Sequence, residues 1–361
     1  MFNSAYCTFD EIKKESGAGL VCYHELQALN KVSTVRAVVA RSCLEYGISI
    51  RSLDILKWYE FNPFLCDYFA SRLIPKDVDL LHLSCSPGLA ILDAVRPKHY
   101  VVNVVAHDLK VSIEEHERYY GIGTYPFKHN TYPYLHELLL KHAENADCVI
   151  CPSTSAEKWI INNLKIKRVK VIPHGCEIPG QFSPLPQKFT AGYLGAFGPD
   201  KGLLYLMIAW DYFDKDSELI FGGSCGSSIK QIATNIIKNN TTYKVLGWVN
   251  NISDFYNQIS VYIQPSVTEG FGIEILEAMS YGRPVIVSSG AGGADAVRDG
   301  IDGFIVPPRN PQAILDKLNY FKKYPANIRE MGRAARERAM EFTWDKVEQK
   351  YEELYKEILN E

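Results

Sequence analysis

Short, mostly apolar runs recur along the whole chain and alternate with segments of helical spacing. Examples are "VDLLHLS", "HYVVNVVAHD", "TAGYLGAF" and "SVYIQPS". Their apolar residues are consecutive, which is typical of strands buried on both faces of a parallel sheet. About eleven such runs occur, and these are too many for one comfortable sheet, so two sheets of about five to seven strands are more plausible. The pattern predicts an α/β protein with two doubly wound parallel sheets.

The chain length agrees with two domains, because 361 residues exceed the usual size for one hydrophobic core. The predicted seam is the Pro- and Gly-rich stretch from Val171 to Phe189, whose prolines preclude a continuous helix or a central strand. We predict a first domain over residues 1–174, a second over 175–340 and a C-terminal helix over 341–361. In open α/β sheets, ligands bind at the carboxyl ends of strands where the order of winding reverses.

Composition argues against several classes of protein. The formal net charge is -3, with no basic excess of the kind that nucleic-acid binders carry. The N-terminus lacks a basic start followed by an apolar run, and no segment approaches the length of an apolar membrane span, so a cytoplasmic location is expected. The cluster of Lys165, Lys167, Arg168 and Lys170 is expected to be a solvated edge, with peripheral contact to anionic lipid as the alternative.

The cysteine pattern also fits a reducing compartment. Nine cysteines are an odd number and are scattered through apparent strands and helices, as expected of buried thiols. The C-x-x-C formed by Cys148 and Cys151 falls in a strand-like run, where alternate residues point to opposite faces. Redox or metal chemistry is therefore not expected there.

The stretch "TEGFGIEILEAM" places glutamates on both sides of a predicted junction between a loop and a helix. Gly270 and Gly272 leave backbone N–H groups accessible at the helix start, where the helix dipole favours an anion such as phosphate. Glu269 would lie before the helix and Glu277 about one turn inside it, with Glu274 between them. The outer pair could accept hydrogen bonds from hydroxyls at both ends of a diphosphate, as in a nucleotide sugar. From spacing alone, it is equally plausible that one carboxylate merely complements the helix dipole and that the other is an ordinary surface glutamate.

The segment that begins with this stretch resembles the donor-binding core of the retaining glycosyltransferases of family four. The resemblance rests on the two glutamates separated by seven residues, together with Gly270 and Gly272 and, in order, Pro284, Ser288, Gly292, Gly293, Gly300 and Gly303. It covers nearly all of the chain and is dense from Val169 to Pro311. It implies the GT-B fold, in which two Rossmann-like domains face each other and a C-terminal helix crosses back to the first domain.

The resemblance implies roles around the glutamate pair. Glu269 would contact hydroxyls of the donor sugar, and Glu277 would bind the nucleotide ribose. The backbone amides of Gly270, Phe271 and Gly272 would approach the sugar and the diphosphate.

The resemblance also points to the segment "LGAFGPDKG". Lys201 matches a lysine that neutralises the diphosphate, but Ala196 occupies the position of the family arginine. Removing one preorganised electrostatic contact can cost roughly 3 kcal/mol. The departure predicts either a compensating basic residue or a weak or specialised catalyst.

Other positions carry weaker signals. His107, at the end of the strand "VVNVVAHD", would by resemblance lie near the reacting centre in a positioning or electrostatic role; in isolation, a loop histidine bonded to backbone is the plainer interpretation. Gly17 and Gly19 would line the cleft at the diphosphate. Val249 lies where the family recognises the base, and Asn251 stands where some guanine-binding relatives carry an acidic residue, which slightly disfavours guanine.

Two D-x-D strings begin at Asp77 and Asp214, one opening a strand and one in a polar turn. Neither is expected to bind metal, because the resembling fold uses lysine and a helix dipole instead. The aromatic stretch from Tyr119 to Tyr134 suits an acceptor lid, but packing against the domain is slightly favoured.

The sequence thus predicts a metal-independent retaining glycosyltransferase without a cofactor, with His107, Glu269 and Lys201 as its catalytic residues. It would move a sugar from a UDP- or GDP-sugar to a hydroxyl of a saccharide, lipid or small-molecule acceptor, and it would have no nucleic-acid partner. One alternative is a nucleotide-sugar-binding protein that has lost transferase activity, as Ala196 suggests. The other is a nucleotide-sugar epimerase on the same architecture.

Overall fold

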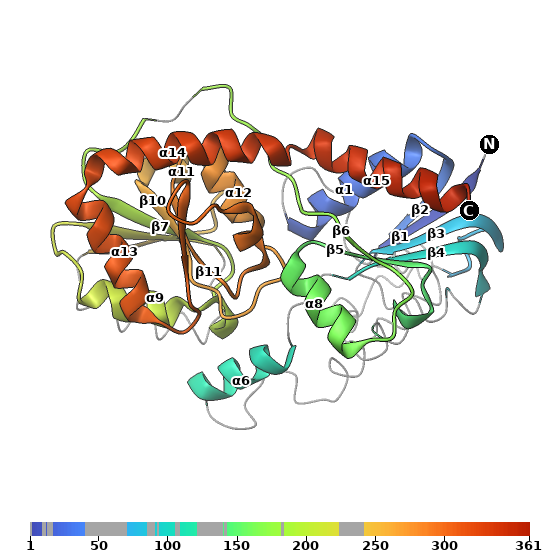
Figure 1. Cartoon of the computed structure of the whole chain (residues 1–361), viewed down its shortest axis with the longest axis horizontal. Coiled ribbons are helices and arrows are strands. Elements are labelled where there is room, and N and C mark those ends of the chain that lie inside the picture. Colours follow the sequence, from blue (N-terminus) through green and yellow to red (C-terminus); the bar gives the residue numbers. More distant parts are fainter. Residues whose placement is uncertain are drawn as a thin grey trace, which may run out of the picture. The chain divides into compact units, whose positions relative to one another are not determined.

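The computed structural model describes residues 2–8, 12, 17–39, 71–84, 91, 94–104, 109–120, 140, 143–181, 184–223 and 242–361. The chain divides into two compact units, whose elements are labelled in Figure 1. Unit 1 comprises Met1–Ala106, Pro126–His174 and Trp344–Glu361, and unit 2 comprises His107–Tyr125 and Gly175–Thr343. Two details differ from the predicted domains. The segment His107–Tyr125 groups with unit 2, and the part of the chain that returns to unit 1 begins at Trp344, not at residue 341.

Unit 1 is built on a six-stranded parallel sheet of order β2-β1-β3-β4-β5-β6. Its strands are β1 (Asn3–Thr8), β2 (Thr34–Val39), β3 (Asp77–Ser84), β4 (Arg96–Asn103), β5 (Cys148–Cys151) and β6 (Val169–Val171). Its described helices include α1 (Gly17–Asn30), α8 (Thr154–Asn163) and α15 (Trp344–Leu359). Helix α8 begins after Ser153, whose hydroxyl accepts from the N–H of Ala156 at 3.2 Å, a typical N-cap.

Unit 2 has a second six-stranded parallel sheet, of order β12-β11-β10-β7-β8-β9. Its strands are β7 (Thr190–Leu194), β8 (Glu218–Gly222), β9 (Tyr243–Gly247), β10 (Val261–Gln264), β11 (Val285–Ser288) and β12 (Gly303–Val306). Its described helices are α6 (Leu109–Tyr120), η1 (Pro199–Lys201), α9 (Leu203–Asp211), α11 (Ile252–Gln258), α12 (Ile273–Ser280), η2 (Gly292–Ala296), α13 (Pro311–Lys323), α14 (Pro325–Ala339) and η3 (Met340–Phe342). The predicted pair of parallel sheets is confirmed.

The sheet of unit 2 is buried on both faces. Along β10, Val261 and Ile263 enter one apolar cluster with residues of α9 and α13, whereas Tyr262 enters another with residues of α11 and α12. Successive side chains of a strand point to opposite faces, so a strand covered on both sides must be apolar throughout. This explains the consecutive apolar residues in the sequence.

The order of winding reverses between β7 and β10. From β7 the chain continues to β8 and β9 on one side, and β10 then starts the other half of the sheet, on the far side of β7. These two strands pair in parallel, with Tyr262 opposite Gly192. The loops that follow Leu194 and Gln264 therefore leave the same edge of the sheet, side by side.

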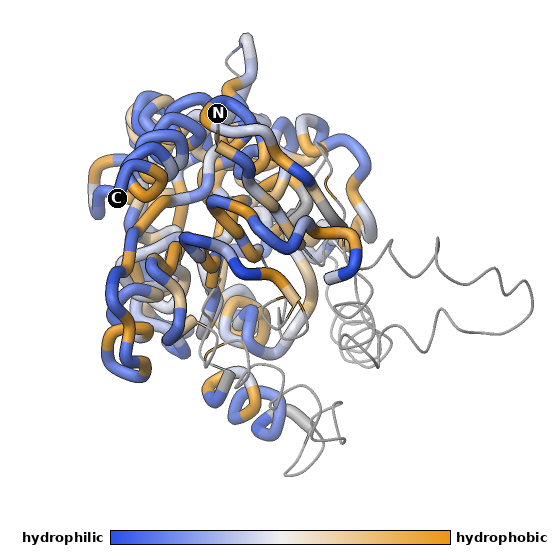
Figure 2. The backbone as a smooth tube through the Cα atoms, turned by 90° about the vertical axis from the view of Figure 1, so that its right-hand side faces the viewer, coloured by the Kyte–Doolittle hydropathy of each residue, from blue (hydrophilic) through white to orange (hydrophobic). Residues whose placement is uncertain are grey.

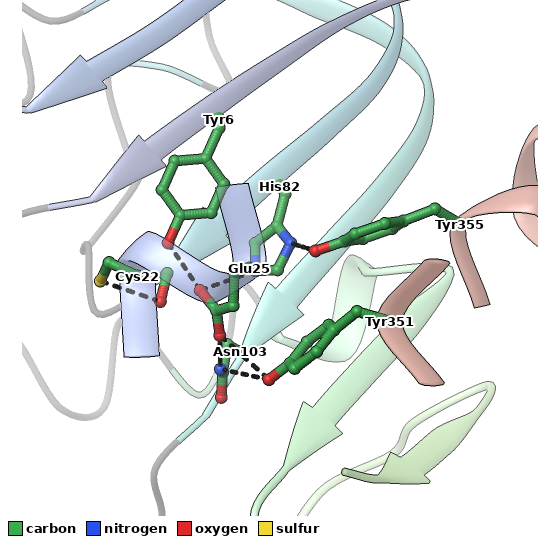
Figure 3. A network of polar contacts seen from close by, with 8 residues as sticks. Tyr6, Cys22, Glu25, His82, Asn103, Tyr351 and Tyr355 are labelled. Atoms are coloured by element: carbon green, nitrogen blue, oxygen red, sulfur yellow. Dashed lines mark hydrogen bonds and ion pairs between the residues drawn. The ribbon is translucent and has the colours of Figure 1, made fainter. Parts of the chain in front are cut away.

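In unit 1, α15 packs on α1 through a buried stripe that includes Val347, Tyr351 and Ile358. Figure 2 shows the corresponding mixture of apolar and polar residues in the helix that ends at the C-terminus. Beneath this stripe, the carboxyl group of Glu25 is fully buried and accepts hydrogen bonds from Tyr6 at 2.6 Å, from Tyr351 at 3.1 Å and from Asn103 (Figure 3). The C-terminal helix is thus held in unit 1 by polar as well as apolar contacts.

Candidate active site

The loop after β10 is held between two neighbouring segments. On one side, the N–H of Val267 donates to the carbonyl of Asp200 at 2.7 Å. On the other, the N–H of Glu269 donates to the carbonyl of Gly290 at 3.0 Å, and the N–H of Gly293 donates to the carbonyl of Phe271 at 2.7 Å. A Cβ at Gly290 would stand 2.3 Å from the carbonyl oxygen of Val267, so only glycine allows this approach. The loop therefore has little freedom to move.

Helix α12 begins directly at the end of this loop. Its N-cap is Gly272, which has a φ of 86° and offers no side-chain hydrogen bond. The side chain of Phe271 is 2% exposed and packs in the apolar core, so this residue fixes the turn from below. No side chain caps the start of the helix, so the positive end of the helix dipole is not neutralised there, as the two glycines predict.

Lys201 lies at the edge of the same loop, where it forms an ion pair with Glu269. Burial alone would lower the pKa of Lys201, but the carboxylates of Glu269, Asp200 and Glu274 outweigh it and raise the pKa above its usual value. Lys201 is therefore a permanent cation at the start of α12. A partly buried cation beside a helix N-terminus is suited to an anionic ligand.

A line of polar groups on alternate residues, running from β10 into the loop after it, supports Glu269. The amide of Gln264 donates to the hydroxyl of Ser266 at 2.8 Å, and this hydroxyl donates to Glu269 at 3.4 Å. Tyr262 contacts the side-chain oxygen of Gln264 and donates to the carbonyl of Leu194 at 3.1 Å. The ends of β7 and β10 are thereby joined by hydrogen bonds.

Glu277 lies inside α12 and accepts a hydrogen bond from the hydroxyl of Tyr256 at 3.0 Å. Burial raises the pKa of Glu277, and the bond from Tyr256 only partly offsets this. The same hydroxyl lies 3.2 Å from the carbonyl oxygen of Glu274, so α11 is fastened to α12 at this point. In the part of the chain that the structure describes, no hydrogen bond is made to the other carboxylate oxygen of Glu277.

Glu274 reaches toward the loop after β7. Its Oε1 lies 3.7 Å from the position that a Cβ would take at Gly195. Burial, followed by the charges of Glu269 and Glu277, raises the pKa of Glu274 to about 8. The third carboxylate of the motif thus belongs to the same site.

The loop after β7 contains Ala196, which occupies the position of the family arginine. Ala196 is exposed, and its carbonyl accepts from the hydroxyl of Tyr193 at 2.7 Å. Within the described residues, Lys201 is the one basic residue whose ion pair involves the glutamates of this motif. No second basic residue in that part of the chain pairs with these glutamates in place of the family arginine.

Helix α6 packs against η1, the short helix that ends in Lys201. Its Glu115 is fully buried and bonded to Tyr205 of α9 and to Arg309, which fixes α6 in unit 2. Leu109, the first residue of α6, comes two positions after His107. His107 itself and most of the aromatic stretch from Tyr119 to Tyr134 lie outside the described residues.

The remaining predicted residues are placed as follows. Gly17 is the first residue of α1 and Gly19 lies in the same turn, in unit 1. Val249 covers Gly222 at the end of β8, where a Cβ would lie 2.7 Å from its Cγ2. Asn251 is the N-cap of α11 and accepts from the N–H of Ser253 at 3.1 Å, a local structural role.

The two D-x-D strings are engaged in surface contacts. Asp79 pairs with Lys98 at 2.6 Å, and Asp214 pairs with Lys322 at 2.6 Å. Among the described residues, no group of three or more His, Cys, Asp or Glu side chains could hold a metal ion. A metal-independent reaction stays a prediction.

Other surface and cysteine predictions can be placed in the same way. In the basic cluster, Arg168 pairs with Glu357 and Glu361, and Lys167 pairs with Asp147. Cys148 and Cys151 are buried in β5, and burial raises the pKa of the Cys148 thiol to about 11. No helix in the described ranges has the length and apolar character needed to cross a membrane.

The structure adds site residues that the sequence did not suggest. Two of them contact a glutamate of the motif: Tyr256 contacts Glu277, and Ser266 contacts Glu269. The other two support Ser266, because Gln264 bonds to Ser266 and Tyr262 bonds to Gln264. A signal for three of them exists in "VYIQPS", where polar groups recur at every second residue of an otherwise buried strand. Tyr256 has no such signal, because it reaches Glu277 from another helix.

Two family models match the chain in succession. Glycosyltransferase Family 4 matches residues 34–178, and Glycosyl transferases group 1 matches residues 188–321. An uncharacterized glycosyltransferase of Methanocaldococcus jannaschii is 28% identical over 59% of this chain and 60% of its own length. A D-inositol 3-phosphate glycosyltransferase of Streptomyces griseus is 34% identical over 30% of this chain and 23% of its own length. The chain thus spans less than two thirds of these curated relatives.

Solved structures support the same assignment of the fold. A sucrose-phosphate synthase from Thermosynechococcus elongatus has a TM-score of 0.78 at 17% identity, covering 100% of both chains. Anabaena Alr3699/HepE, in complex with UDP and glucose, has a TM-score of 0.72 at 16% identity and covers 99% of this chain and 100% of its own. With the two parallel sheets and the motif at the start of α12, these matches show that the chain belongs to the family-four glycosyltransferases of group 1 and has the GT-B fold.

Proposed function

We propose that the protein transfers a sugar from a nucleoside diphosphate sugar to a hydroxyl acceptor, with retention at the anomeric carbon and without a metal ion. The observation that carries this proposal is the ion pair between Lys201 and Glu269 at the N-terminus of α12. It lies at the point where the winding of the sheet reverses, the usual ligand-binding edge of such sheets. UDP and glucose in the HepE complex are consistent with a donor of this class.

The geometry suits each part of such a donor. The diphosphate would take the place beside Lys201 and the start of α12, where a cation and a helix dipole both favour negative charge. Glu269 would bind hydroxyls of the sugar, and Glu277 would bind the ribose with its remaining oxygen. When the bond to the anomeric carbon breaks, negative charge grows on the departing diphosphate, so Lys201 would contribute most at that moment.

In the proposed reaction the acceptor hydroxyl attacks the face that the diphosphate leaves, and the leaving phosphate takes the acceptor proton. The scheme needs no covalent intermediate on the protein and no divalent cation. The proposed acceptor is a saccharide, a lipid or a small molecule. The catalytic role of His107 and a cytoplasmic location stay predictions.

The test is release of nucleoside diphosphate from a panel of UDP- and GDP-sugars, with chelator present and with a range of hydroxyl acceptors. Glu269→Ala should abolish turnover while leaving nucleoside diphosphate affinity largely intact, because this substitution frees Lys201 from its partner. Glu330→Ala, on the exposed face of α14, is the matched control. NMR of the first product formed shows whether the anomeric configuration is retained.

The second candidate, a binding protein without transferase activity, is favoured by Ala196. It predicts that a nucleotide sugar stabilises the protein against heat, while no nucleoside diphosphate is released with any acceptor or any length of incubation.

For the transferase, a Glu269→Ala variant with full turnover would remove that residue from the mechanism.

A further inference from the structure

Glu274 is the one carboxylate of the motif to which the proposed function gives no role. It is the second residue of α12, and its Oε1 points to Gly195, the neighbour of Ala196. Within the described residues, no Lys, Arg or His forms an ion pair with it. The side chain therefore lies at the edge of the proposed diphosphate site, beside the position that lacks the family arginine.

The groups around Glu274 are rich in negative charge. Glu269 and Glu277 flank it on its own segment, and η1 contributes Asp200 and Lys201, the one cation near it within the described residues. In that same part of the chain, the other titratable groups that face it are the phenols of Tyr193 on β7, Tyr262 on β10 and Tyr256 on α11. If all four carboxyl groups were charged, one lysine would have to balance them and also the diphosphate.

This imbalance is relieved if Glu274 carries a proton. Burial and the charges of Glu269 and Glu277 raise its pKa to about 8, so the side chain is mostly neutral at pH 7. A neutral carboxylic acid can donate a hydrogen bond, whereas a carboxylate can only accept one. A phosphate oxygen is an acceptor, so protonation turns Glu274 from a repelling group into a binding group.

We propose that Glu274 binds the donor diphosphate as a neutral carboxylic acid and donates a hydrogen bond to a phosphate oxygen, in part replacing the arginine that is absent at Ala196. This inference rests on the proposed function and specifies how its site balances charge. Its consequence is that the diphosphate and one proton bind together. At alkaline pH, Glu274 must first take up that proton.

The experiment measures the dissociation constants of UDP and GDP between pH 7 and 9.5 by calorimetry, for the wild-type protein and for Glu274→Gln. The wild-type dissociation constant should be constant below about pH 8 and rise about tenfold per pH unit above it, because only the protonated form binds. Glu274→Gln keeps an N–H donor without a titrating proton, so its affinity should not change with pH until the nucleobases themselves lose a proton at the alkaline end of the range, which affects both proteins equally. At pH 9.5 the variant should bind roughly 30-fold more tightly than the wild type.

Other groups are not expected to produce this profile. The pKa of Lys201 is raised above its usual value, and those of Tyr193, Tyr256 and Tyr262 lie well above theirs. Glu277→Gln is a specific control, because it should weaken nucleotide binding throughout and keep the slope. In this variant the dissociation constant should begin to rise at a lower pH than in the wild type, since the charge of Glu277 helps to raise the pKa of Glu274.

A second readout is proton uptake. At pH 9, titrations in buffers of different ionisation enthalpy should show close to one proton taken up per nucleotide by the wild type and none by Glu274→Gln. A wild-type dissociation constant that does not change from pH 7 to 9.5, or one that rises just as steeply in Glu274→Gln, overturns the inference and leaves the proposed function standing. If neither protein binds a nucleoside diphosphate at pH 7, the proposed function fails as well.

Discussion

Glu115 on α6 accepts a hydrogen bond from Nε of Arg309 at 2.5 Å, although the two residues are 194 positions apart. Tyr205 donates to its other oxygen at 3.0 Å, and the Glu115 side chain is fully buried. Glu115→Gln should lower the free energy of unfolding by roughly 2 kcal/mol, because Arg309 and Tyr205 lose a charged acceptor. Urea denaturation measures this effect. Glu114→Gln, exposed on the same helix, is the control, and an equal change in both variants would contradict a role for the buried bonds.

Lys201→Met should weaken binding of nucleoside diphosphates by roughly 30-fold, because a charge-assisted contact to phosphate is worth about 2 kcal/mol. The effect should be larger than that of most surface lysines, since the substitution also leaves Glu269 without its partner. Lys215→Met is the control, because that lysine is exposed and contacts only the carbonyl of Asp211 at 2.8 Å. Calorimetry with UDP and GDP measures both variants. A change of less than twofold for Lys201→Met would place the diphosphate elsewhere.

Both sheets could be predicted from the sequence, because a strand that is buried on both faces is mostly apolar at consecutive positions, as β11 is from Val285 to Val287. The turn before α12 could be predicted as well, since Gly270 and Gly272 carry a local signal for an uncapped helix start. These features depend on residues that are close together in the chain.

The partners of the site residues could not be predicted in the same way. Tyr256 meets Glu277 from another helix, and Lys201 meets Glu269 across 68 residues. Asn251 matches a base-recognition position by sequence but is the N-cap of α11. The grouping of α6 with unit 2 depends on Glu115, which reads as an ordinary surface charge in "SIEEHER". Such contacts are decided by how the elements pack, and sequence spacing says nothing about them.

Tyr355→Phe should lower the free energy of unfolding by roughly 1 to 2 kcal/mol, since it removes the partner of a buried ring nitrogen. The hydroxyl of Tyr355 lies 2.7 Å from Nδ1 of His82, and both side chains are fully buried (Figure 3). Because Tyr355 belongs to α15, limited proteolysis should also cut this helix sooner in the variant. Tyr212→Phe is the control, as Tyr212 is 80% exposed. Equal stability of the Tyr355 variant and the wild type would mean that the contact with His82 does not help to hold α15.

His174 should make the protein sensitive to mild acid. Burial lowers its pKa from 6.5 to about 4, so the folded protein keeps it neutral while the unfolded chain takes up a proton below pH 6.5. The contribution of this histidine to the free energy of unfolding is fully present above pH 6.5. It is lost as the pH falls toward 4, by up to about 3 kcal/mol. His82, whose pKa burial also lowers, acts in the same direction. Urea denaturation at pH 7.5 and 5 measures the loss. It should be smaller in His174→Gln because the contribution of His174 is gone, but it should not vanish, since His82 remains. An identical loss in that variant would show that the acid sensitivity comes from other groups.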